Sequence, residues 1–210
     1  YTASQGLLLM IPNMYKIAAE QLPCVFHVSA RTVSTHALNI FGDHSDVMAC
    51  RQTGFAMLCE GNVQEVMDLS PVAHLAALSG KVPFINFFDG FRTSHEIQKI
   101  AVWDYKDLAD MCDMDAVKAF REHALNPEHP AMRGSHENGD TFFQHREACN
   151  QYYDALPEVV EKYMGKINEK LGTDYKLFNY YGAPDADRVI IAMGSICDVA
   201  EEVIDYLNAH

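Results

Sequence analysis

The sequence predicts an α/β protein: a parallel, doubly wound sheet, followed by the first strand and helix of a second α/β domain. Short runs of β-branched and aromatic residues alternate with helical patterns in the first half, which is typical of strand–helix–strand units. A second strand, glycine and helix pattern begins near residue 188. The length agrees, since 210 residues suffice for one domain and part of another.

The clearest strand–helix–strand unit ends at residue 88. A helix is predicted from Asn62 to Leu78, because Asn62 is a good N-cap, Glu65 stands three residues later and apolar residues follow at helical spacing. Gly80 is expected to end this helix. Residues 82–88 then have the composition of a buried strand that runs into Asp89-Gly90.

Two shorter strands are expected before this unit, over residues 25–28 and 46–49. The first consists of strong β-formers and ends at Ser29-Ala30-Arg31. Strands of this length that alternate with helices pair in parallel and are covered on both faces.

The second half of the chain changes character. Residues 125–150 are rich in turn-forming residues, but we expect them to be ordered because four nearby aromatic residues need burial: Phe142, Phe143, Tyr152 and Tyr153. A helix is predicted from Pro157 to Leu171, ended by Gly172.

A new unit is predicted at the C-terminal end. Residues 188–193 have the pattern of a buried strand, Gly194 of a turn, and Ser195 with Asp198 of a capping box for a helix that runs to Leu207. We therefore divide the chain into residues 1–178, most of one domain, and residues 179–210, the start of another. Because the chain begins without Met and ends directly after a helical pattern, we expect an internal fragment of a longer protein.

Composition and charge exclude several classes of protein. Hydrophobic residues make up 49% and charged residues 21%, which rules out a disordered chain and a coiled coil. A formal net charge of −13 argues against nucleic acid or an anionic membrane as partner, and the apolar runs are too short to span a bilayer. The six scattered cysteines contain no CxxC pair, which disfavours iron–sulfur and structural zinc sites here and fits reduced thiols in the cytoplasm.

Arg31 is the first candidate functional residue. It lies at the carboxyl end of a predicted strand, where open α/β sheets bind ligands, and a guanidinium can grip a carboxylate through two parallel hydrogen bonds. The alternative is an ion pair between Arg31 and a structural Asp or Glu of the chain.

A second group of polar residues lies in the loop Phe41–Asp46, where His44 with Asp43 or Asp46 could move protons or orient a substrate. Equally, the aspartates could cap turns while His44 forms a local hydrogen bond. Gln52, in the Arg51–Gly54 turn, follows a predicted strand and could reach the same face.

The stretch Phe88–Glu96 also follows a strand end. Its charged residues Arg92, His95 and Glu96 could contact a ligand or an adjoining domain, and we favour the interface. No GxGxxG, P-loop, GxSxG or HExxH pattern is present, so dinucleotide, nucleotide, serine-hydrolase and zincin readings lack their usual support.

Taken together, long composite motifs closely resemble the pyruvate:ferredoxin (flavodoxin) oxidoreductase family. The matching segments are Thr2–Lys16, His27–Arg31, Ile40–His44, Arg51–Leu58, Phe87–Ile100, Asn126–Pro130 and Tyr181–Ala186. Cys24 and Cys59-Glu60-Gly61 depart from the family pattern, and neither falls on the motif that contains Arg31.

The resemblance implies a thiamine-diphosphate-binding domain of the pyrimidine type, followed by the start of a transketolase C-terminal-like domain. Enzymes of this family decarboxylate pyruvate oxidatively with coenzyme A, using thiamine diphosphate, Mg²⁺ and iron–sulfur clusters, and pass electrons to ferredoxin or flavodoxin. It also implies a homodimer of multidomain chains in the cytoplasm, or in the hydrogenosome of a eukaryote.

The family's substrate-carboxylate arginine corresponds to Arg31, and Asp43, His44 and Gln52 are further candidates for lining the site. The thiamine-activating glutamate, the metal and diphosphate ligands and the cluster cysteines of the family have no counterpart in these residues, so we expect the chain alone to bind no cofactor tightly. The alternatives are a related 2-oxoacid or NADP-linked oxidoreductase, or a non-catalytic module derived from this domain.

Overall fold

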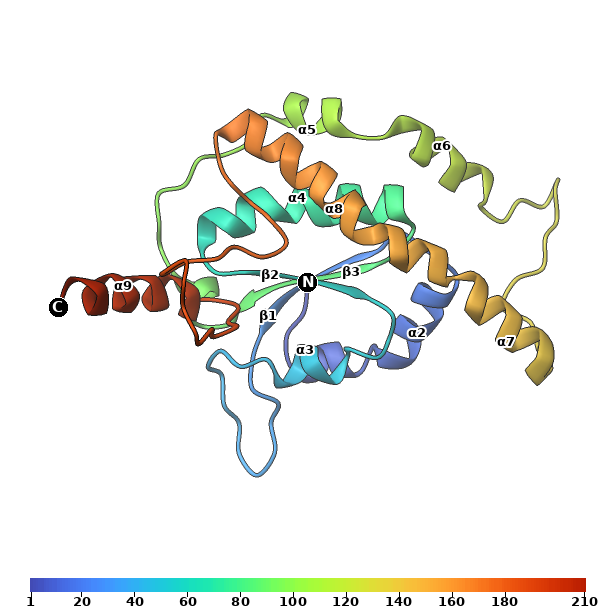
Figure 1. The fold of residues 1–210 in the computed structure, drawn as a ribbon. Coiled ribbons are helices and arrows are strands. Elements are labelled where there is room, and N and C mark those ends of the chain that lie inside the picture. The colour runs from blue at the N-terminus through green and yellow to red at the C-terminus, as the bar shows by residue number, and fades with distance from the viewer.

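The computed structural model describes residues 1–210, with a three-stranded parallel sheet at its centre (Figure 1). The strands are β1 (Val25–Ala30), β2 (Ala56–Glu60) and β3 (Phe84–Asp89), in the spatial order β1-β3-β2. Phe84 at the start of β3 is level with Val25 of β1 and Ala56 of β2. All three carboxyl ends therefore lie at one edge of the sheet.

Helices cover both faces of the sheet, which confirms the doubly wound α/β class (Figure 1). On one face, α4 (Val63–Gly80) and α8 (Asn150–Leu171) bury a cluster of 13 residues that includes Phe84 and Tyr163. On the other, α1 (Gln5–Leu8), α2 (Ile11–Ala19) and α3 (Ser45–Ala49) pack on a cluster of 10 that includes Phe87. Each face has its own hydrophobic core.

Helix α4 begins as predicted. The Asn62 side chain accepts a hydrogen bond from the Glu65 N–H at 3.0 Å, which satisfies one of the free amides of the first turn. Its end differs, because Gly80 is still helical and Lys81 takes the left-handed conformation, with φ of 55°. A left-handed residue is still what ends the helix, but the glycine does not supply it.

One predicted strand is wrong: residues 46–49 belong to helix α3. Polar groups at its start make the difference, because Asp46 accepts the Val47 N–H and Asp43 accepts the Ser45 N–H, as at helix N-termini. The strand that follows is β2, which was not predicted. A short apolar run does not by itself distinguish a strand from a helix turn.

The middle of the chain is helical and largely exposed, with α5 (Tyr105–Met111), α6 (Met114–Glu122) and α7 (Gly139–Ala148). The expected burial of Phe142 and Phe143 is wrong, since these side chains are 57% and 65% exposed. Pro157 does not begin a helix but lies inside α8, which starts at Asn150 and ends as expected at Gly172.

The C-terminal segment departs most from expectation. Residues 188–193 form no strand, and the side chains of Ile190 and Ile191 are 91% and 88% exposed. A strand needs a neighbour to satisfy its backbone groups, and this segment pairs with neither edge of the sheet. Helix α9 (Ile196–Ala209) is present, with its far end projecting from the body of the protein (Figure 1).

None of the helices has both the length and the apolar character that crossing a membrane requires.

Candidate functional site

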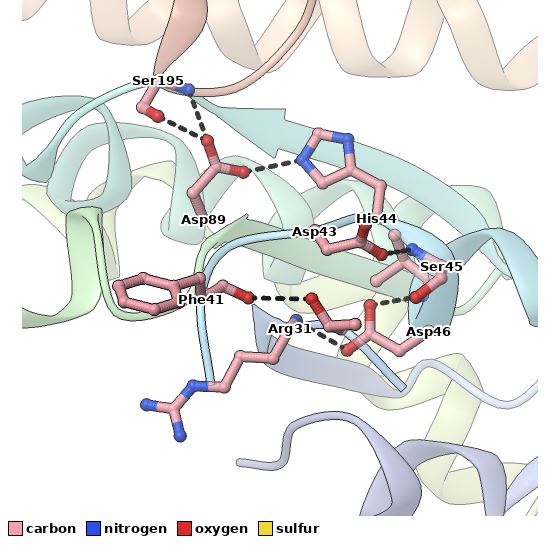
Figure 2. Close-up of polar contacts among 10 residues, drawn as sticks. Arg31, Phe41, Asp43, His44, Ser45, Asp46, Asp89 and Ser195 are labelled. Atoms are coloured by element: carbon pink, nitrogen blue, oxygen red, sulfur yellow. Dashed lines mark hydrogen bonds and ion pairs between the residues drawn. The ribbon is translucent and has the colours of Figure 1, made fainter. Parts of the chain in front are cut away.

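Three of the polar motifs meet at the carboxyl edge of the sheet. Arg31 follows β1, Asp89 ends β3, and the loop that leaves β1 returns so that Gly42 forms an antiparallel bridge with Arg31 (Figure 2). The Asp43 N–H is 3.5 Å from the carbonyl oxygen of Ala30. Parallel strand ends lie together, so residues far apart in sequence become neighbours here.

Arg31 is held closely at its backbone and stem. Its N–H donates to Asp46 Oδ2 at 3.1 Å. Gly90 packs against the stem, since a methyl group there would collide with Arg31 Cγ and lie 2.7 Å from the Ala30 carbonyl oxygen. A residue other than glycine would displace the arginine.

The guanidinium of Arg31 makes no ion pair within the chain, and its Nε is buried without a hydrogen-bond partner. In Figure 2 the side chain points away from both Asp46 and Asp89. The ion pair with a structural carboxylate, considered above as the alternative, is therefore not formed.

His44 and Asp89 form the charged pair of this edge. His44 Nε2 lies 2.7 Å from Asp89 Oδ1, while Asp89 Oδ2 accepts from the N–H and Oγ of Ser195, at 2.8 and 2.6 Å (Figure 2). The hydrogen bond from His44, followed by those from Ser195, lowers the pKa of Asp89 to about 2. The same bond raises the pKa of His44 above its usual value.

The Ser195 contact corrects the capping box predicted with Asp198. The Ser195 side chain makes no cap bond to α9 and instead joins the start of α9 to the end of β3. Gly194 is required beside it, because a side chain there would lie 2.9 Å from an Asp89 carboxylate oxygen.

A cavity of about 390 Å³ opens between the loop, the end of β3 and the start of α9. Its polar lining consists of Gly42, Asp43, His44, Asp89, Arg92 and Ser195, and its apolar lining of Met193, Ile196 and Val199. Arg92 is paired to Glu96 at 2.8 Å and contributes little free charge.

The remaining candidates lie apart from Arg31 or serve local structure. Gln52 is exposed in the turn between α3 and β2, before the amino end of β2, and the structure does not bring it to the carboxyl edge. Asp43 accepts the Ser45 N–H at 2.6 Å, and its hydrogen bonds with Ser45 lower the pKa of Asp43.

The partner of His44 is Asp89 and not Asp43 or Asp46, the two partners considered from the sequence. Since Asp89 ends a strand, the rule that parallel strand ends meet was the signal that could have paired them.

The chain forms no cluster of three or more His, Cys, Asp or Glu side chains that could hold a metal ion. Of the cationic side chains at the carboxyl edge, His44 and Arg92 are paired with carboxylates, whereas Arg31 has no such partner; its guanidinium is suited to a small carboxylate.

The chain is an open parallel α/β domain, a class in which the carboxyl edge of the sheet is the usual place for ligands, and it presents an arginine there. The sequence matches, over residues 1–165, the family described as "Pyruvate flavodoxin/ferredoxin oxidoreductase, thiamine diP-bdg". The chain belongs to this family.

Similar proteins agree with this assignment. The chain is 66% identical over 209 residues to a pyruvate-flavodoxin oxidoreductase of Enterobacter agglomerans, covering 100% of the chain and 18% of that protein. It is 64% identical over 207 residues to a pyruvate:ferredoxin oxidoreductase of Moorella thermoacetica, covering 99% of the chain and 18% of the relative. A pyruvate dehydrogenase [NADP(+)] of Cryptosporidium parvum is 54% identical over 99% of the chain, which covers 11% of that protein. The chain thus spans a small part of each relative's length.

Proposed function

We propose that the chain is a substrate-binding part of an enzyme that oxidises pyruvate with coenzyme A to acetyl-CoA and CO₂, with ferredoxin or flavodoxin as electron acceptor. The observation that carries the proposal is Arg31, whose guanidinium lies at the strand ends without an internal carboxylate partner. Membership of the family supports pyruvate as the source of the carboxylate.

The proposed role of Arg31 follows from guanidinium chemistry. Two parallel N–H donors match the two oxygens of a carboxylate, so the pair fixes orientation as well as charge. A 2-oxoacid held in this way has its oxo carbon at a defined place. Asp43 and His44 line the cavity at the same edge, which Arg31 itself does not line, and we propose that they shape the site together with Arg31. A role for Gln52 remains a prediction.

Further parts of the proposal concern what the chain works with. We infer thiamine diphosphate with Mg²⁺, iron–sulfur clusters and coenzyme A as cofactors of the whole enzyme, in a cytoplasmic homodimer. The family description supports the first of these. We also propose that residues 1–178 and 179–210 belong to successive domains, with the second domain supplying the strand partners that residues 188–193 lack here.

The second candidate is an NADP-linked enzyme, favoured by the 54% identity to the Cryptosporidium parvum protein. The acceptor domain is not part of these residues, so the gene sequence beyond codon 210 decides between the two. A flavin domain there would favour NADP.

A chimera tests the main proposal. This chain replaces the matching segment of the Enterobacter agglomerans enzyme, and pyruvate-dependent, coenzyme-A-dependent reduction of flavodoxin is measured. We expect a kcat/KM for pyruvate within about tenfold of the unmodified enzyme, a difference of about 1.4 kcal/mol.

A chimera that folds and holds its cofactors but does not reduce flavodoxin with pyruvate would favour a non-catalytic module. One that prefers 2-oxobutyrate to pyruvate would assign a related 2-oxoacid instead.

A further inference from the structure

Asp46 is a buried carboxylate whose hydrogen bonds all go to backbone amides. Its side chain is 0% exposed. Oδ2 accepts the N–H of Ser4 at 2.9 Å and that of Arg31 at 3.1 Å, and Oδ1 accepts the Val47 N–H at 2.7 Å. These donors come from the turn before α1, the end of β1 and the first turn of α3.

Burying a carboxylate without a cation costs free energy, which the hydrogen bonds from its donors must offset. Burial raises the pKa of Asp46, while the backbone hydrogen bonds from Arg31, Ser4 and Val47 oppose the rise. The carboxylate joins three segments that are distant in sequence, at the residue where the arginine leaves the sheet.

Arg31 is consequently fixed from three sides. Asp46 holds its N–H, Gly42 pairs with its backbone in the returning loop, and Gly90 lies against its stem. Because the guanidinium is at the end of a long side chain, a small rotation of the backbone at residue 31 displaces the guanidinium further than it displaces the backbone. Displacements of about 1 Å are enough to weaken a positioned contact considerably.

We propose that Asp46 is a positioning residue, which sets the backbone of Arg31 so that its guanidinium meets the substrate carboxylate. This inference rests on the proposed function of Arg31. It concerns a different residue, which touches no substrate and acts only through the arginine.

The test is Asp46→Asn in the chimeric enzyme. The amide is isosteric, but an NH₂ group in place of Oδ2 loses the hydrogen bonds from Ser4 and Arg31, and one in place of Oδ1 loses the bond from Val47 and sets two donors against each other. We expect the KM for pyruvate to rise about tenfold, equivalent to about 1.4 kcal/mol, with kcat within about twofold.

Asp68→Asn is the matched control. Asp68 is also a buried carboxylate, 2% exposed, but it accepts from Gln64 and Tyr175, away from the carboxyl edge. We expect this control to lower thermal stability and leave the KM for pyruvate unchanged. Because KM does not depend on the amount of active enzyme, partial folding of a variant does not obscure the result. If Asp46→Asn yields no soluble enzyme, Asp46→Ser, which keeps a polar residue at the start of α3, is measured in the same way.

A double-mutant cycle with Arg31→Lys separates the two hypotheses. If Asp46 acts through Arg31, the rise in KM of the double variant is clearly smaller than the product of the two single rises. If Arg31→Lys alone leaves KM unchanged, the proposed function of Arg31 fails. If Arg31→Lys raises KM but Asp46→Asn, or Asp46→Ser in its place, lowers only stability, or if the rises multiply, the positioning role is overturned.

Discussion

Two carboxylates at the ends of neighbouring strands, the partly exposed Asp89 of β3 and the fully buried Glu60 of β2, are held in opposite ways. Asp89 receives hydrogen bonds from His44 and Ser195, and its pKa falls to about 2. Glu60 is 0% exposed, accepts one side-chain hydrogen bond from Asn86, and burial keeps its pKa well above the usual value. The partly exposed carboxylate is therefore the more readily ionised, and the buried one the less readily.

A polar cluster around Glu60 extends from β2 across β3 to helix α4. Asn86 donates to Glu60, and its oxygen accepts from Ser70 Oγ at 3.1 Å and lies 2.7 Å from His27 Nδ1. His27 Nε2 in turn lies 2.9 Å from His74 Nε2. This arrangement ties the sheet to α4, whereas the side chain of Arg31, at the carboxyl edge, has no ion-pair partner in the chain. The difference separates what holds the fold from what we propose to serve binding.

The largest effect on stability is expected from substituting Asn86, at the centre of the polar cluster around Glu60. Asn86→Ala removes the partner of Glu60, His27 and Ser70 at once, and buried polar groups left unpaired cost about 1–3 kcal/mol each. We expect the free energy of unfolding of the chain, measured in urea, to fall by about 3 kcal/mol. The control Asn179→Ala, in an exposed loop, should change it by less than about 0.5 kcal/mol. An equal loss in the two variants would contradict a structural role for the cluster.

Glu60 should make stability fall as the pH rises. Between its ordinary value of 4.5 and its raised pKa, the folded chain binds a proton that the unfolded chain has lost. The free energy of unfolding then decreases by up to about 1.4 kcal/mol per pH unit. Glu60→Gln keeps the acceptor for Asn86 and removes the proton. Subtracting its urea unfolding curves from those of the parent chain should leave this slope, and a flat difference would show that Glu60 is ionised.

The His44–Asp89 pair is expected to change the free energy of unfolding less, and its contribution is lost at both high and low pH. The stability that it contributes is complete between pH 3.8 and 6.5, is lost as pH rises through the raised pKa of His44, and is lost as pH falls towards about 2. In Asp89→Asn, the NMR titration midpoint of the His44 ring should move down to its usual range.

Asp43→Asn is the comparison for this titration, since Asp43 acts on His44 only through charge and less strongly. A midpoint that moves equally in both variants would mean that the 2.7 Å contact between His44 and Asp89 is not what raises the pKa of His44.

The sequence predicted the sheet class, β1, β3 and α4 because hydrophobic periodicity and an N-cap are local signals. It did not predict α3, because a short apolar run does not distinguish a strand from a helix turn. Nor did it predict the Asp89–Ser195 contact, which joins residues 106 apart. It predicted a strand at residues 188–193 from composition alone, but a strand also needs a partner. Arg31 and His44 are candidates that the sequence alone can suggest, whereas their hydrogen bonds to Asp46 and Asp89 depend on tertiary structure.

The central claim is that Arg31 binds the substrate carboxylate, and the kcat/KM for pyruvate of Arg31→Ala in the chimeric enzyme tests it most directly. Losing a charge-assisted pair in a closed site costs about 2–4 kcal/mol, so we expect a fall of about 30- to 1000-fold. Thiamine diphosphate content and cluster absorbance should match those of the parent chimera. A kcat/KM close to the parent value, or a loss that follows lost cofactor or misfolding, would contradict the account.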